Sequence, residues 1–134
     1  MKSAPQSWIM FHKPGFELAE AVNAFARTNL FVTQQGETLL VRWNDHPTLE
    51  AGPTLQVHFL SGTAVQDEAV ALSKRSNAKP YASVLLQCDS RFVISFDNLE
   101  VVLDEINTLI EVQATLQEAT DGILYNNWNK QISQ

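Results

Sequence analysis

This sequence has little of what usually signals chemistry. A single cysteine, Cys88, among 134 residues excludes an internal disulfide, which suits a reducing compartment. The five glycines form no G-x-G-x-x-G or Walker phosphate loop, and no G-x-S-x-G serine-hydrolase motif is present. The three histidines lack H-x-x-x-H spacing and there is no C-x-x-C pair, so no metal site is predicted. The sequence favours a non-catalytic protein without a cofactor.

Long hydrophobic runs are also missing. The apolar run near the N-terminus covers only residues 8–11, which is shorter than a signal peptide requires. No stretch approaches the roughly 18 apolar residues of a membrane-spanning helix. We therefore expect a cytoplasmic protein without a membrane partner.

Clusters of basic residues are absent as well. The chain has 9 Lys and Arg against 15 Asp and Glu, for a net charge of −6. Proteins that bind nucleic acids concentrate Lys and Arg on one surface, because phosphate contacts supply most of their affinity. The sequence therefore predicts no nucleic-acid partner.

The acidic charge is concentrated in one segment. Residues 96–122, FDNLEVVLDEINTLIEVQATLQEATDG, contain seven acidic residues and no lysine or arginine. Their apolar residues recur at helical spacing, and Gly122 is suited to end the helix. Glu100, Asp104, Glu111 and Glu118 fall on one side of a helical wheel, opposite the apolar side chains. This acidic face either meets only solvent, as charged helix faces commonly do, or meets a basic protein partner.

The apolar sector of this predicted helix is wider than one core-facing stripe needs. Val101, Val112 and Ala119 lie together beside the main stripe, near Glu105. The final strand or a second subunit could cover them, although scattered exposed valines are also common. A homodimer with an interface at Val101, Glu105 and Val112 is one prediction from this pattern.

Length and periodicity predict a single α+β domain over residues 1–134. The expected order is strand 7–12, helix 16–29, hairpin 30–43, strand 54–60, helix 63–77, strand 91–96, the acidic helix and a final edge strand. This order matches a ferredoxin-like (split βαβ) antiparallel sheet with an additional long C-terminal helix and edge strand, in a two-layer sandwich. Residues 81–88 read as either a short helix or a strand, with a helix or turn preferred. No motif of a known family is present.

Alternation along the strands predicts two different sheet faces. The predicted core face consists of Ile9, Phe11, Leu39, Val41, Trp43, Leu55, Val57, Phe59, Phe92, Ile94 and Phe96. The opposite face consists of Trp8, Met10, His12, Leu40, Arg42, Gln56, His58, Leu60, Arg91, Val93 and Ser95.

Three interpretations of this second face remain open. It could be partly exposed or covered by the third helix, or it could pair with a second subunit. It could also form a pocket for a small anionic molecule, with Arg42 and Arg91 as charge partners. The ligand-binding candidates are therefore Arg42, His58, Arg91, His12 and Trp8.

Other residues with chemical potential have simpler explanations. Cys88 lies in the apolar run VLLQC, where cysteine behaves as a small buried hydrophobic residue. Tyr125 and Trp128 alternate with asparagines in a final segment that reads either as an ordinary edge strand or as a recognition strand.

The favoured function is a non-catalytic protein-interaction or accessory module, with the acidic helix facing a basic partner through Glu111 and Glu118. Small acidic inhibitors and immunity-type proteins resemble this chain in charge and size. The alternative is a small-ligand-binding protein, or an enzyme with weak sequence signals, that uses the second sheet face.

Overall fold

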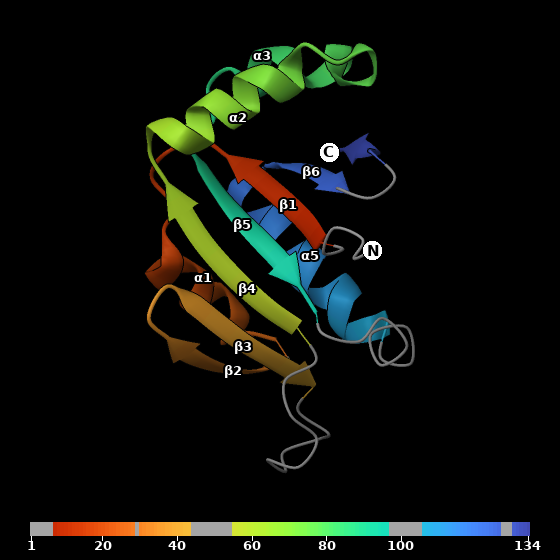
Figure 1. Ribbon diagram of the computed structural model, residues 1–134. Helices are drawn as coiled ribbons and strands as arrows, with labels where there is room; N and C mark the ends of the chain where they lie inside the picture. The colour runs from red at the N-terminus through yellow and green to blue at the C-terminus, as the bar shows by residue number, and fades with distance from the viewer. Residues whose placement is uncertain (1–6, 29, 44–54, 97–105, 127–129) are drawn as a thin grey trace, which may run out of the picture.

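A seven-stranded antiparallel sheet forms the centre of the molecule (Figure 1). The computed structural model describes residues 7–28, 30–43, 55–96, 106–126 and 130–134, with the side chains of 42, 43 and 106–108 left out. The strands are β1 (Ser7–His12), β2 (Leu30–Gln35), β3 (Thr38–Trp43), β4 (Leu55–Ser61), β5 (Ser90–Ser95), β6 (Ile123–Asn126) and β7 (Ile132–Ser133). They lie in the order β2-β3-β4-β5-β1-β6-β7.

The α+β class and the antiparallel sheet are confirmed, but the ferredoxin-like order is not. In a ferredoxin-like (split βαβ) sheet, one antiparallel strand separates the two strands that the crossover helix connects, whereas here β3, β4 and β5 all lie between β1 and β2. Here β1 pairs antiparallel with both β5 and β6, and β2, β3, β4 and β5 follow one another as consecutive antiparallel neighbours. Since β7 pairs with β6, the expected C-terminal edge strand is itself covered by a two-residue strand.

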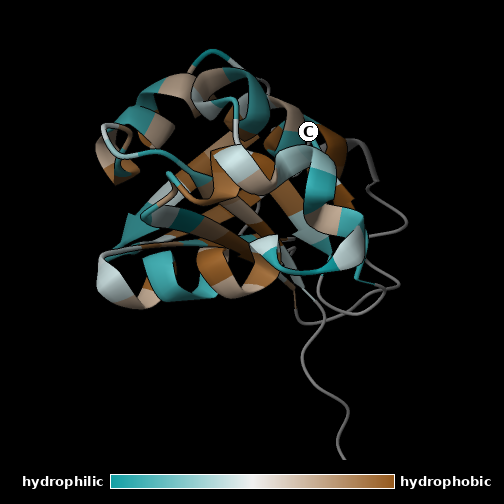
Figure 2. Cartoon of the chain, turned by 90° about the horizontal axis from the view of Figure 1, so that it is seen from above, coloured by the Kyte–Doolittle hydropathy of each residue, from teal (hydrophilic) through white to brown (hydrophobic). Residues whose placement is uncertain are grey.

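Helices pack on both faces of the sheet, so the described chain has more than the two layers expected (Figures 1 and 2). Helices α1 (Leu18–Phe25) and α5 (Ile106–Thr120) pack on one face. Helix α2 (Thr63–Ser73), the 3-10 helix η2 (Ser76–Tyr81) and α3 (Ala82–Leu85) pack on the other. Within residues 81–88, Tyr81 ends η2 and Ala82–Leu85 form α3, so the regular part of this segment is helical. The first part of the predicted acidic helix, residues 97–105, lies outside the described residues.

The first core lies between the sheet, α1 and α5. The strands contribute side chains that alternate along them, and Phe25 from α1 and Leu116 from α5 are fully buried against them. The strand members of this core are Trp8, Met10, Leu30, Leu39, Val41, Leu55, Val57, Phe59, Phe92 and Ile94.

A second, smaller core lies on the opposite face, where it extends over only part of the sheet. Phe11 and Ile123, from β1 and β6, pack there against Val65, Ala69 and Leu72 of α2. Ala78, Leu85 and Cys88 complete the cluster. The second helical layer therefore covers β1 and β6.

The direction in which β1 points its side chains was predicted wrongly. Trp8 and Met10 lie in the first core, whereas Phe11 and Ile9 face α2. A strand buried on both faces reads as a continuous apolar run, so alternation cannot tell which residues face which layer. The register confirms the placement, because Trp8 pairs with Ile94 and Met10 with Phe92.

Helix α5 ends in a way that the sequence suggested only in part. Asp121, at φ 53°, is the residue in the left-handed region, the place that glycine was expected to take. Gly122 is needed for another reason, because a Cβ atom there would lie 2.6 Å from the carbonyl oxygen of Phe11. The glycine allows the chain to pass close to β1 as it enters β6.

Candidate functional site

The face of β2–β5 opposite α1 and α5 is open in the part of the chain that the structure describes. Phe31 on β2 is 41% exposed and Leu60 on β4 is 38% exposed, and His58 and Thr33 are also exposed. Leu40 and Val93 are half-buried on the same face. We refer to the described side chains of this surface as the open face: Phe31, Thr33, Gln35, Thr38, Leu40, Gln56, His58, Leu60, Arg91, Val93 and Ser95.

Neutral polar contacts organise the middle of the open face. Thr38 and His58 are cross-strand partners on β3 and β4, and the Thr38 hydroxyl lies 2.9 Å from Nδ1 of His58. Apolar and neutral polar side chains alternate around this pair, with Leu40 beside Gln56 in the register. Such a surface has the mixed but weakly charged character of a protein interface core.

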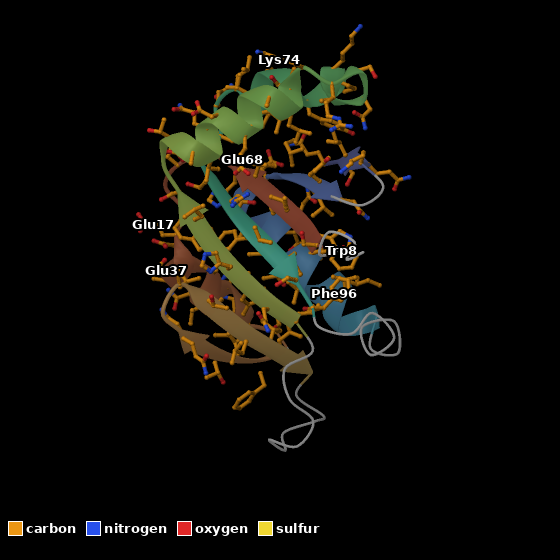
Figure 3. All side chains as sticks on the ribbon, viewed as in Figure 1. Trp8, Glu17, Glu37, Glu68, Lys74 and Phe96 are labelled. Carbon is orange, nitrogen blue, oxygen red and sulfur yellow. The ribbon has the colours of Figure 1, made fainter. Side chains whose placement is uncertain are left out.

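Arg91 is the only charged residue among the described side chains of the open face, and it is neutralised. Its Nη1 lies 2.8 Å from both carboxylate oxygens of Glu68 on α2. The Arg91 side chain is 18% exposed, and its Nε is buried without a hydrogen-bond partner in the described structure. Glu68, labelled in Figure 3, thus joins α2 to the end of the open face near β5.

The structure separates the five predicted ligand-binding residues. His58 and Arg91 share the open face. Arg42 lies in β3 opposite Phe31, and its side chain is outside the described part. His12 and Trp8 lie on the other face, at 1% and 9% exposure, so they cannot contribute to a site on the open face.

The interface candidates are also separated. Val112 is fully buried in the first core of the monomer, so it does not form an exposed flank. Tyr125 is half-buried on β6, packed against the second core. Val101, Glu105 and Trp128 lie outside the described residues.

Of the predicted acidic face, only Glu111 and Glu118 lie among the described residues. Glu118 is exposed and Glu111 is half-buried. Both line a cavity of about 380 Å³ between α1 and α5, together with Arg27 and Thr115. Because α5 packs on the face opposite the open face, the acidic side chains and the open face are on different sides of the sheet.

His12 is a buried core residue with an unusual environment. Its ring stacks on Phe92 at 5.2 Å between centroids and meets Phe16 edge-on at 5.8 Å. Nδ1 lies 2.7 Å from the carbonyl oxygen of Lys13, so Nδ1 carries the proton and donates it. Nε2 is buried with no partner among the described residues. Burial lowers the pKa of His12, because the charged imidazolium would lose its hydration there.

Cys88 is buried as predicted, and burial is the main cause that raises the pKa of its thiol to about 11. Its Sγ donates to the carbonyl oxygen of Val84 at 3.3 Å. A thiol in this state is a poor nucleophile, because the thiolate is the reactive form.

Known proteins offer no guide to this site. No family model, curated protein or solved structure matches the chain. Within the described residues no three His, Cys, Asp or Glu side chains gather as metal ligands do, and no helix is long and apolar enough to cross a membrane. The open face is therefore interpreted from its own chemistry.

Sequence reasoning missed the part that α2 plays at this surface. The side chains of Glu68 and Arg75 line a cavity beside the open face, yet the sequence placed both simply within the predicted helix 63–77. The capacity of Glu68 to bridge to β5 had no signal in the sequence, because the pair is separated by 23 residues.

Proposed function

We propose that this protein is a non-catalytic protein-interaction module that forms a homodimer through its open face. The observation that carries the proposal is the exposure of Phe31 and Leu60 on a sheet face whose described side chains are neutral apart from the Arg91–Glu68 pair. The two side chains lie at opposite ends of the face, with polar side chains and the half-buried Leu40 and Val93 between them. Surfaces that mix apolar and polar side chains in this way are typical of protein interfaces.

Charge favours a second copy of the chain as the occupant. Each copy carries −6, so two copies repel each other through most surfaces. On the open face the described side chains carry only the Arg91 charge, which Glu68 neutralises. A two-fold interface places the same patch on both subunits, and a neutral patch avoids opposing like charges.

Such a dimer leaves the outer surfaces free for another partner. Helix α5 lies on the opposite side of the sheet, so each subunit would present Glu111 and Glu118 outward. Two acidic surfaces in one assembly suit a basic protein partner, because linked contacts raise the overall affinity. An accessory or inhibitor-like role is consistent with this arrangement.

The experiment compares two exposed leucines. Leu60→Glu places a charge on the open face, whereas Leu86→Glu makes the same change at a leucine that is 53% exposed directly after α3. We expect the wild type and Leu86→Glu to be dimers by light scattering at about 50 μM, and Leu60→Glu to be a folded monomer. A monomeric wild type, or a dimer that Leu60→Glu leaves intact, would refute the interface.

The basic-partner role is tested separately in the dimer. Glu111→Lys combined with Glu118→Lys should weaken capture of a basic partner from the host at least tenfold while the dimer persists. Unchanged capture by this double variant would exclude the described part of α5 as the partner site.

A further inference from the structure

A cavity lies where α2 meets the sheet, beside the open face but not part of it. Its volume is about 300 Å³, and it is lined by Ile9, Phe11, Glu68, Ala71, Leu72, Arg75 and Tyr125. Strands β1 and β6 supply its floor, and α2 with the turn after it supplies the wall. This volume is at the lower end of the range for small-molecule sites.

The floor of the cavity is apolar and only partly shielded. Phe11 and Leu72 are almost fully buried, at 3% and 7% exposure, whereas Ile9 and Tyr125 are half-buried. The parts of Ile9 and Tyr125 that remain accessible line this shallow, largely open cavity. Burying them would release water from apolar surface without any rearrangement of the fold.

The two charged residues at the rim are not equivalent. Glu68 already holds Arg91, with Nη1 of Arg91 2.8 Å from both of its oxygens. Arg75 lies between α2 and η2 and is exposed. Its guanidinium makes no ion pair or side-chain hydrogen bond within the described structure. The rim therefore carries one neutralised pair and one free positive charge.

We propose that this cavity binds a small carboxylate with an apolar body, such as an aryl- or alkyl-carboxylate of about twelve non-hydrogen atoms. The apolar body lies on Ile9, Phe11 and Tyr125, and Arg75 holds the carboxylate. A guanidinium can donate two parallel hydrogen bonds to a carboxylate, which favours this group over a neutral amide. The cavity is a separate site from the proposed dimer interface: Glu68 contacts Arg91 of the open face, but none of the lining residues is itself one of the open-face side chains.

The probe is 4-phenylbutyrate, compared with 4-phenylbutyramide, which has the same size and no charge. Binding is followed by NMR titration of the ¹⁵N- and methyl-labelled protein. We expect shifts centred on Ile9, Ala71 and Leu72, and at least fivefold weaker binding of the amide. Equal binding of both compounds, shifts centred elsewhere, or no binding up to 10 mM 4-phenylbutyrate would overturn the proposal.

Three variants make the test specific. Arg75→Gln removes the charge and should weaken 4-phenylbutyrate at least fivefold. Arg27→Gln removes an exposed arginine beside α1, on the other side of the sheet, and should have no effect. Ala71→Phe fills the cavity from an exposed position of α2 and should abolish binding without unfolding the protein. Binding that Arg75→Gln and Ala71→Phe leave unchanged would refute the site.

Discussion

Acid should destabilise this protein through His12. The imidazole is 1% exposed and lies between the rings of Phe92, Phe59 and Phe16. Its pKa is lowered from 6.5 mainly by burial, and the Lys13 carbonyl and the Asp89 carboxylate oppose the shift only in part. The unfolded chain therefore binds a proton at a pH where the folded protein does not.

The sign and size of the effect follow from this difference in proton binding. Above pH 6.5 both states are largely neutral at this residue, and the stability of the folded state is fully present. Below pH 6.5 the unfolded state gains a proton, and stability falls until the pH reaches the folded-state pKa. Each pH unit in this window costs about 1.4 kcal/mol, so the loss at pH 5 is at most about 2 kcal/mol.

His12→Phe should remove this pH dependence. Phenylalanine keeps the ring contacts and eliminates the unpartnered Nε2, at the cost of the hydrogen bond to Lys13, worth about 1 kcal/mol. We therefore expect similar stability to the wild type at pH 7.5 and up to about 2 kcal/mol of relative stabilisation at pH 5.

Urea unfolding at pH 7.5 and pH 5.0 measures the effect, with fluorescence and circular dichroism as two independent probes. His58→Gln is the matched control, because it replaces a histidine that is exposed rather than buried. If His12→Phe loses as much stability between the two pH values as the wild type does, the buried neutral imidazole is not the cause.

Three further predictions test the packing. Gly122→Ala should destabilise the fold by about 1–3 kcal/mol in thermal or urea unfolding, because its Cβ would meet the Phe11 carbonyl; an unchanged midpoint would contradict this close approach. Cys88 should react with a thiol reagent at pH 8 only as fast as the protein unfolds. Its contribution to stability should be present below pH 9.0 and be lost between pH 9.0 and about 11, a change of up to about 2.7 kcal/mol that Cys88→Ala should abolish. Glu68→Gln should cost under about 1 kcal/mol, since the carboxylate that binds Arg91 is half exposed; a larger loss would show that the pair is more deeply buried in solution.

Local patterns in the sequence predicted much of the secondary structure. Strands β3, β4 and β5 alternate clearly, and their core and open faces agree with the prediction at Leu39, Val57 and Ile94. The burial of Cys88 was also predicted from its apolar neighbours. Each of these strands packs against a core on one face only, so the alternation of apolar and polar residues directly indicates which side chains are buried.

The sheet face of a candidate residue was predicted correctly only where one strand face is solvated. His58 was placed on the open face because its neighbours on β4 alternate between apolar and polar. Trp8 and His12 were misplaced because β1 is apolar on both sides, and Val112 was misread because a wide apolar sector on a helix can be filled by packing within one subunit. The spacing of apolar residues alone does not show which face of β1 meets each core, or whether Val112 is covered within one subunit.

The sequence by itself determined the class of this protein: an acidic α+β chain, without disulfides, whose alternating strands require an antiparallel sheet. Only the tertiary structure decided the order of the strands, the helices that cover each face and the side of β1 that meets each core. The physical reason is that local propensity and periodicity act within one element, whereas strand order and burial depend on contacts between distant elements. The Arg91–Glu68 pair and the close approach of Gly122 to Phe11 exist only once those elements have packed.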